Sequence, residues 1–357
     1  MRFITGIFDK LQKHPKRVVF PDGKDPRIIQ TARQFFVLRM GIPILLGGRS
    51  EILHIADEMG VSLKGIRIID PSESDDLNCF TRRFEVLRGS SVQIGENEAR
   101  AAMKQHNFFA TMMLAMHQAD LLVAGGNVTN GAVLRPLLQI LNPNAKMGTI
   151  CGCQIVELED ERNKEIGADG VLLLADCDVQ KNPSMEQLAE IALSTARLAS
   201  ILLERPPRVA FLSHTTNVNK TTLETSRQRA ASELAMQKAR NEKLTAYFDG
   251  ELQLDTAIIM EIARKKLLPE EMGEVAGRAN VLIFPNLDAA NIASRIIQYL
   301  VRVNVYGDIL LGMDRVAAEI SRGASAHEIL GVTAVMGEYY NQCRKWFPRI
   351  ADNIPGE

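Results

Sequence analysis

The sequence has no long apolar run, almost no net charge and few cysteines. None of its apolar stretches approaches the roughly 18–20 residues that a membrane-spanning helix needs, so the sequence does not predict a membrane protein. Its 42 basic and 43 acidic residues give a formal net charge of -1, and so no overall field favours nucleic acid or an anionic membrane as a partner. An anionic substrate would need a local site.

Sequence patterns for metals and for secretion are missing as well. The five cysteines contain no Cys-x-x-Cys pair, and the six histidines show no i, i+4 spacing on a helix, so we expect no bound metal. Residues 1–14 alternate apolar side chains with Asp9, Lys10 and Lys13, which interrupts the apolar core that a secretory signal requires. An odd number of thiols is typical of a reducing compartment. We therefore expect a cytoplasmic protein.

Short apolar runs alternate with helical patterns along the 357 residues. This alternation predicts an α/β fold with a mainly parallel sheet covered by helices, and the length favours two domains. Strands are predicted at residues 17–20, 42–46, 66–69, 121–124, 148–153, 171–175, 208–212, 281–284 and 332–335. Helices are predicted at residues 27–40, 97–118, 185–203, 223–244, 256–266 and 289–303.

One candidate site is a loop of small residues, Ser321-Arg322-Gly323-Ala324-Ser325, which precedes a predicted helix at Ala326. The free N–H groups and the dipole at a helix N-terminus attract anions, and Arg322 adds a bidentate donor. The loop could therefore bind phosphate. The alternative is that Ser325 and Glu328 form a capping box and that Arg322 is a surface charge.

Three other segments carry clustered polar groups. The loop from Gly125 to Gly131 follows a strand and precedes a helix that carries Arg135, and it is either a ligand loop or a tight turn. Asp249 to Asp255 places three carboxylates and an amide in a predicted turn, where they could bind metal, act as a base or cap a helix. Residues 213–217 supply hydroxyls that could orient a ligand.

Taken in order, these segments resemble the phosphate acetyltransferase family, with the butyryltransferase branch as the nearest sister. The resemblance runs from about residue 17 to about residue 336. Its most specific pieces are Val19-Phe20-Pro21-Asp22, Asp176-Cys177-Asp178 with Asn182-Pro183 and Gln187-Leu188-Ala189-Glu190-Ile191-Ala192, Asp249-Gly250-Glu251-Leu252-Gln253, Ile283-Phe284-Pro285 with Leu287-Asp288, and Leu311-Gly312 with Ser321-Arg322-Gly323.

The resemblance implies two α/β domains of the isocitrate/isopropylmalate dehydrogenase-like type. The first would comprise residues 1–147 and 309–357, and the second residues 148–308. It also implies a homodimer formed through the second domain, an active-site cleft between the domains, and a reaction that needs no metal. The substrates would be CoA or acyl-CoA and phosphate, with no permanently bound cofactor, and the acyl group would pass through an acyl phosphate.

The resemblance also assigns roles to single residues. Ser321 and Arg322 match the Ser-Arg pair that is thought to stabilise the transition state, and Glu328 stands where the family has its proposed base, an aspartate. Arg88 and Arg135 match two arginines associated with phosphate or CoA binding. Further substrate-binding residues are expected at Thr129, Ser213, Thr215, Thr216 and Asn291.

Two segments depart from the family pattern. Where the acetyltransferases have Ser-x-Ser-Thr-Lys-Gly-Ser, this chain continues from Thr216 with Asn217-Val218-Asn219, which removes a positive charge. The family's Asp-Leu-Asp-Ala-Gly-Asn appears as residues 286–291 with Ala290 in place of glycine, followed by Ser294-Arg295. The departures leave open a catalytically weak or inactive acyl-CoA-binding sensor or interaction protein. A dehydrogenase of the same fold would need metal and nicotinamide motifs that the sequence lacks.

Overall fold

The computed structural model describes residues 2–89, 95–126, 130–141, 148–216 and 223–346. Contacts within the chain divide it into two compact units. The first unit combines Arg2–Pro143 with Met313–Glu357, and the second unit is Asn144–Gly312. The dimerisation role and the active-site cleft stay predictions.

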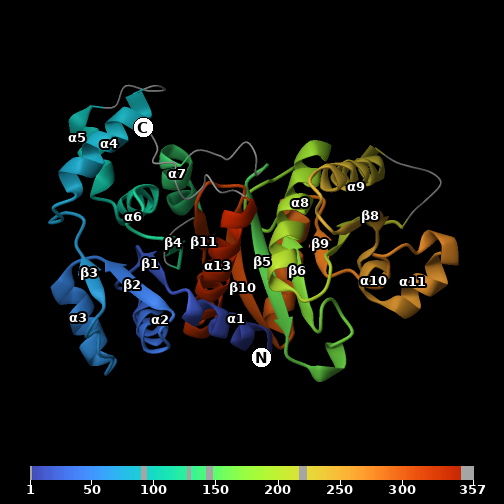
Figure 1. Ribbon diagram of the computed structural model, residues 1–357, viewed down its shortest axis with the longest axis horizontal. Coiled ribbons are helices and arrows are strands. Elements are labelled where there is room, and N and C mark those ends of the chain that lie inside the picture. Colours follow the sequence, from blue (N-terminus) through green and yellow to red (C-terminus); the bar gives the residue numbers. More distant parts are fainter. Residues whose placement is uncertain (1, 90–94, 127–129, 142–147, 217–222, 347–357) are drawn as a thin grey trace. The chain divides into compact units, whose positions relative to one another are not determined.

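The first unit contains five parallel strands in the order β3-β2-β1-β4-β11 (Figure 1). The chain runs from β1 outward to β2 and β3 and then crosses to the other side of β1 to form β4, so the strand order reverses between β1 and β4. Parallel α/β sheets bind ligands at the carboxyl ends of strands beside such a reversal. The strands are β1 (Lys16–Phe20), β2 (Gly41–Leu46), β3 (Arg67–Ile69), β4 (Leu121–Ala124) and β11 (Val316–Glu319).

Helices of the first unit group into two sets. The helix α13 contacts α1 and α2, whereas α6 contacts α4, α5 and α7. The apolar stripe of α1 is buried through Ile4, Ile7 and Leu11, and α13 presents Gly337 to Leu11 because a Cβ there would lie 2.5 Å from its Cδ1 atom. The helices are α1 (Arg2–Lys13), α2 (Pro26–Val37), α3 (Arg49–Glu58), α4 (Leu77–Gly89), α5 (Glu96–Met103), α6 (His106–Ala115), α7 (Asn130–Ile140) and α13 (Ala326–Trp346).

The second unit contains a mixed sheet in the order β10-β5-β6-β9-β7-β8. The four strands β6, β9, β7 and β8 are parallel, and β5 is antiparallel to both of its neighbours. The strands are β5 (Cys151–Leu158), β6 (Val171–Ala175), β7 (Arg208–Leu212), β8 (Tyr247–Leu252), β9 (Val281–Ile283) and β10 (Val303–Leu311). The helices are α8 (Met185–Leu202), α9 (Leu223–Asn241), α10 (Leu254–Ile258), α11 (Met260–Lys266) and α12 (Leu287–Leu300).

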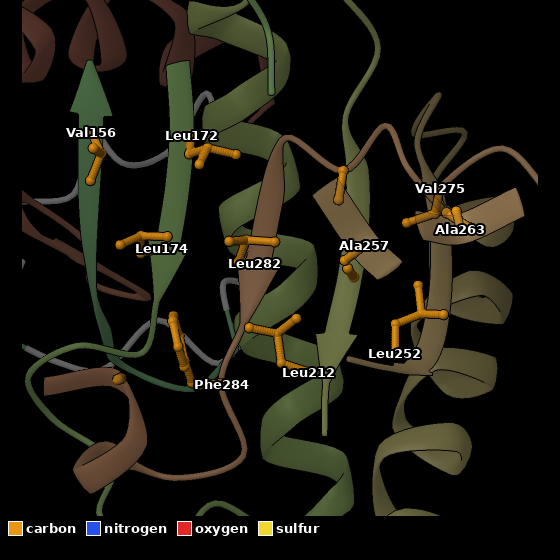
Figure 2. Packing of buried hydrophobic residues seen from close by; sticks show 14 of the residues in the cluster. Val156, Leu172, Leu174, Leu212, Leu252, Ala257, Ala263, Val275, Leu282 and Phe284 are labelled. Atoms are coloured by element: carbon orange, nitrogen blue, oxygen red, sulfur yellow. The ribbon is translucent and has the colours of Figure 1, made fainter. Parts of the chain in front are cut away.

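A buried apolar cluster covers one face of this second sheet. Figure 2 shows its side chains extending from Val156 on β5 through Leu174 on β6 and Leu282 on β9 to Leu252 on β8. Small side chains from the short helices, such as Ala257 of α10, complete the cluster and let these helices lie close to the sheet. This core fixes the carboxyl ends of β6, β7, β8 and β9, where the second unit carries its polar loops.

The α/β prediction is confirmed, and several element predictions are wrong. The predicted strand 332–335 lies inside α13, where residues 329–339 are all buried. A helix buried around its whole circumference has an apolar run that periodicity cannot distinguish from a strand. The predicted helix 97–118 is two helices, α5 and α6, and 256–266 spans parts of α10 and α11. The strand predicted at 148–153 begins instead at Cys151, and β8, β10 and β11 were not predicted. No described helix has the length and apolar character to cross a bilayer.

Candidate active site

Three loops follow the carboxyl ends of β1, β4 and β11 in the first unit. The strands are neighbours in the order β1-β4-β11, so these loops leave the sheet at one edge, beside the reversal of strand order. The Ile320 N–H group donates to the Ala124 carbonyl at 2.8 Å and extends the β4–β11 pairing up to the Ser321 loop. The sequence therefore folds the Ser-Arg segment into the position where a parallel sheet binds its ligands.

The Ser321 loop forms a turn that leaves its cation accessible. The Ala324 N–H group donates to the Ser321 carbonyl at 3.1 Å. Ser321 is half-buried and Arg322 is exposed, and no described residue forms an ion pair with Arg322. An exposed guanidinium can pair with an anionic oxygen, and the hydroxyl of the neighbouring serine can donate a hydrogen bond to it.

Glu328 lies in the first turn of α13 and takes part in its N-terminal cap. The Ser325 N–H and hydroxyl groups donate to Glu328 Oε2 at 2.8 and 2.9 Å, and the Glu328 N–H group donates to Ser325 Oγ at 3.2 Å. The alternative of a Ser-x-x-Glu capping box is thus confirmed as a structure. The Glu328 carboxylate is thus held by Ser325 at the start of α13, and its predicted role as a base stays a prediction.

An ion pair between the half-buried Arg27 and the buried Asp25 joins these loops, and the sequence analysis did not single it out. Asp25 caps α2 by accepting the Arg27 N–H group at 2.9 Å, as the Asp-Pro pattern before this helix indicates. Its two carboxylate oxygens also accept from Arg27 Nε at 3.1 Å and from Nη2 at 2.6 Å. The hydrogen bonds to Asp25 raise the pKa of Arg27 above its ordinary value. The sequence signal was an Asp-Pro-Arg triplet after a strand, which is weak alone.

The loop after β4 needs its two glycines for different reasons. Gly125 has φ +117°, and a Cβ there would lie 2.9 Å from Glu319 Cγ, which fits the tight-turn interpretation. Its N–H group donates to Asp22 Oδ2 at 3.0 Å, and burial raises the pKa of Asp22. Thr129, predicted to bind substrate, lies outside the described residues.

Arg88 and Arg135 come from two helices of the first unit that contact each other, α4 and α7. Arg88 is half-buried in the last turn of α4, and its Nε atom is buried with no hydrogen-bond partner within the described chain. Arg135 is exposed on α7. The two arginines thus lie on neighbouring helices. Their role in binding phosphate or CoA stays a prediction.

The predicted hydroxyls of the second unit lie together after β7. Ser213 is half-buried, and its N–H group donates to the Leu252 carbonyl at 2.9 Å. Thr216 Oγ1 accepts from the Gln253 N–H group at 2.9 Å and donates to Thr256 Oγ1 at 3.3 Å. The Thr215 hydroxyl is buried and has no hydrogen-bond partner in the part of the chain that the structure describes. Thr216 therefore ties the loop to α10, whereas the buried Thr215 hydroxyl has no described part in that link.

The acidic segment Asp249 to Asp255 is not the turn that we predicted. Its first half belongs to strand β8, and Glu251 is fully buried with its Oε1 atom 3.4 Å from Arg229. Asp255 stands in the first turn of α10 and pairs with Lys266 at 2.8 Å. The carboxylates separate because Glu251 lies in β8, whereas Asp255 lies on the helix that follows the strand. No three His, Cys, Asp or Glu side chains among the described residues are arranged to hold a metal ion.

Two buried aspartates support the sheet of the second unit. Asp176 accepts backbone N–H groups from Gly152 at 2.8 Å and from Gln180 at 2.6 Å, and so fixes the segment after β6. Burial, and next the charge of Asp178, raises the pKa of Asp308 well above its ordinary value. Asn291 is exposed on α12, which begins at the carboxyl end of β9.

A cavity of about 440 Å³ lies at the amino ends of strands β1 and β2, opposite the ends that carry the candidate site. Its walls include Pro15, which precedes β1, and Gly41 and Ile42, which begin β2. The amino ends of parallel strands are not where such sheets bind substrates, so this cavity is not part of the candidate site.

Sequence relatives of known name extend over nearly the whole chain. A phosphate acetyltransferase of Acetivibrio thermocellus is 34% identical over 344 residues, which is 95% of this chain and 99% of the relative. A phosphate acetyltransferase of Thermoanaerobacterium thermosaccharolyticum is 36% identical over 338 residues, 94% of this chain and 98% of the relative.

Solved structures agree with the sequence relatives. The EutD phosphotransacetylase of Staphylococcus aureus superposes with a TM-score of 0.82 at 28% identity and covers 95% of this chain and 98% of its own. A phosphotransacetylase of Streptococcus pyogenes gives 0.83 at 28% identity, with 96% and 98% covered. A family profile, phosphate acetyl/butaryl transferase, matches residues 2–337. With the Ser-Arg loop at the expected edge of the sheet and these matches along its length, the protein belongs to the phosphate acetyl/butaryl transferase family.

Proposed function

We propose that this protein transfers an acetyl or other short acyl group reversibly between CoA and inorganic phosphate. The observation that carries the proposal is the exposed Arg322 beside Ser321 at the carboxyl edge of the first sheet, in a chain that belongs to this family. Acetyl is the first candidate because both sequence relatives described above are named phosphate acetyltransferases.

The reaction requires that the CoA thiol lose its proton and that the negative charge on the phosphate oxygens be stabilised. In the direction that consumes acetyl phosphate, the CoA thiolate attacks the carbonyl carbon and a C–S bond forms. The C–O bond to phosphate then breaks, and phosphate leaves with the bonding electron pair. A base must take the thiol proton, and a cation must stabilise the charge that develops on oxygen.

The described residues can meet these needs as follows. Arg322 would hold the phosphoryl oxygens through its guanidinium fork, and the Ser321 hydroxyl would donate to the developing oxyanion. Glu328, in the first turn of α13, would take the thiol proton. Arg88 and Arg135 would bind the phosphates of CoA, and Ser213, Thr215, Thr216 and Asn291 would bind substrate from the second unit.

A thiol-release assay tests the function directly. With acetyl-CoA and phosphate, the wild-type protein should release free CoA thiol only when phosphate is present. Ser321→Ala should lower the rate about 100-fold, because a hydroxyl that stabilises an oxyanion contributes on that scale. Ser62→Ala, an exposed serine in the same unit, is the matched control and should leave the rate unchanged.

Calorimetry with CoA separates catalysis from binding alone. If CoA binds but no thiol is released, and Ser321→Ala changes neither result, the protein is a sensor and the proposed function is wrong. Propionyl-CoA and butyryl-CoA in the same assay identify the acyl group, and we expect the highest kcat/KM with acetyl-CoA.

We also propose that the protein is a homodimer formed through α12. One face of this helix exposes large apolar side chains, with Ile292 61%, Ile296 52%, Tyr299 67% and Leu300 80% exposed. Their spacing places them on one stripe, and contiguous apolar surface of this kind marks an interface with another chain. Because the family resemblance implies dimerisation through residues 148–308, we propose that a second copy of this chain packs against this apolar face.

Light scattering on a sizing column tests the dimer. The wild-type protein should elute with twice the chain mass of 39.6 kDa. Ile296→Lys should produce monomers, whereas Val86→Lys, at an exposed apolar residue of α4, should not. A dimer that persists in Ile296→Lys would contradict this interface.

The cytoplasm is the proposed location. The five cysteines form no disulfide, and four of them are buried as thiols, which fits a reducing compartment. Fractionation of source cells should place the thiol-releasing activity in the cytosolic fraction.

A further inference from the structure

Arg27 has all of its side-chain donors engaged by the protein itself. A guanidinium carries five N–H groups. Nε and one N–H of Nη2 donate to Asp25, and the second N–H of Nη2 is 3.2 Å from the Gly126 carbonyl. Both N–H groups of Nη1 donate to backbone carbonyls, at 2.7 Å to Arg322 and at 2.9 Å to Ala324. No donor of Arg27 is left for a ligand.

These contacts join three segments that are distant in sequence. The start of α2, the loop after β4 and the loop after β11 meet at one guanidinium, and the link to Arg322 spans 295 residues. Asp25 is buried, with 4% of its surface exposed, and its carboxylate holds the guanidinium plane from both oxygens. The fork therefore has one orientation, which a flexible ammonium could not reproduce.

Gly126 provides an independent sign that the space around this guanidinium is fixed. A Cβ at Gly126 would lie 2.7 Å from Arg27 Nη2 and 3.1 Å from Asp25 Oδ2. The backbone of Gly126 does not have a positive φ, so close approach rather than backbone conformation explains this glycine. Any side chain there would push the guanidinium away from the Arg322 carbonyl.

We propose that Arg27, oriented by Asp25, is a positioning residue for the Ser321-Arg322 loop. It holds the Arg322 and Ala324 carbonyls, and so sets the direction in which the Arg322 side chain and the Ser321 hydroxyl leave the backbone. The catalytic part of this inference rests on the proposed function. The structural part, that Arg27 holds the loop, does not.

A second bond lets the two effects be separated. The Thr31 hydroxyl donates to the Ala326 carbonyl at 3.1 Å and ties α2 to the start of α13 independently of Arg27. Loss of the Arg27 fork should therefore release residues 322–324 and leave α13 in place. Arg27→Lys keeps the charge and removes the fork. Arg33→Lys, on the same helix and with no ion pair to a described residue, is the matched control.

Hydrogen–deuterium exchange tests the structural part without any substrate. In Arg27→Lys, the amides of Ile320 and Ala324, which donate within this loop and its strand, should exchange at least about 10-fold faster than in wild type, with peptides of α13 unchanged. Arg33→Lys should match wild type. Equal exchange in Arg27→Lys and wild type would overturn the proposal, whatever the activity of the protein.

Steady-state kinetics tests the catalytic part. Because a misplacement of ~1 Å can cost ~100-fold in rate, kcat of Arg27→Lys should fall about 100-fold, while KM for CoA stays within about twofold of wild type. A rise in KM for CoA with an unchanged kcat would show that Arg27 binds the substrate, and would overturn the positioning role. Gly126→Ala should lower kcat in the same way while keeping Arg27. Agreement between the two variants would show that the loss does not come from misfolding of one of them.

The two failures remain distinguishable. If wild-type protein shows no thiol release, the proposed function fails, and the exchange experiment still decides whether Arg27 holds the loop. If wild type is active and Arg27→Lys is equally active with unchanged exchange, the positioning role fails and the function stands.

Discussion

The loops after β11 and β7 both have a serine near their start and carry polar side chains, but they use these side chains in opposite ways. In the β11 loop, backbone carbonyls hold the structure through Arg27, and the Arg322 side chain is exposed. In the β7 loop, the Thr216 side chain itself holds the structure through Gln253 and Thr256. A polar residue in a strand-end loop is thus available for chemistry only where something else fixes the backbone.

The largest effect expected from this contrast is at Arg322. Arg322→Ala should lower kcat/KM for acetyl phosphate about 100- to 1,000-fold, because it removes a charge that stabilises the transition state. The melting temperature should not change, since the loop is held through the carbonyl of Arg322 and not its side chain. Arg264→Ala, an exposed arginine of α11, is the control. A normal KM and kcat in Arg322→Ala would refute the assignment.

Glu328 sharpens the comparison because it has both a structural and a proposed chemical role. Glutamine also serves in capping boxes, so Glu328→Gln should keep the helix cap and lose the base. We expect kcat to fall about 100-fold with an unchanged melting temperature. Glu328→Ala should lose both. If Glu328→Gln retains full activity, the residue only caps the helix.

The pair Thr215 and Thr216 tests the β7 loop residue by residue. Thr216→Val removes the bonds to Gln253 and Thr256 and should lower stability by about 1 kcal/mol, or about 2–4 °C in melting temperature. Thr215→Val removes a buried hydroxyl with no described partner, so it should leave stability unchanged and raise KM for a substrate. The reverse result, with Thr215 costing stability and Thr216 costing substrate binding, would break the contrast drawn here.

The smallest effect concerns pH and Asp308. Burial raises the pKa of this carboxyl in the folded protein, so the folded state keeps a proton that the unfolded state releases near its ordinary pKa of ~3.9. The contribution of Asp308 to the free energy of unfolding is therefore complete below pH ~3.9, and it is lost as the pH rises through the raised pKa of the folded state. Asp308→Asn stays neutral at every pH. Its melting temperature relative to wild type should therefore rise by about 2 °C or more between pH 5 and pH 8. No change with pH would show that Asp308 is ionised in the folded protein.

Patterns in the sequence located most of the framework. The strand 121–124 and the capped helix from Met185 were predicted at the correct residues, because each has a short apolar run or a Ser-x-x-Gln start that local physics determines. The strand β8 was missed because its acidic residues resemble a turn. Its buried Glu251 pairs with Arg229 from α9, and a partner 22 residues away leaves no local signal.

The candidate site was only partly accessible from sequence. The Ser321-Arg322 loop could be found because small residues before a helix indicate an anion site. Arg27 could not, because its role depends on carbonyls at Gly126, Arg322 and Ala324, and a carbonyl acceptor is present in every residue. A contact that uses only backbone acceptors leaves no trace in the residue types it joins.

The link between Arg27 and Arg322 also has a consequence for how the chain assembles during synthesis. Residues 144–312, which are contiguous, can complete their own sheet as they emerge, since domains fold as units from the N-terminal side. The first unit must wait for β11 and α13 to add the last strand and the loop that Arg27 holds. Whatever chemistry the carboxyl ends of these strands perform is therefore withheld until β11 and α13 have been made.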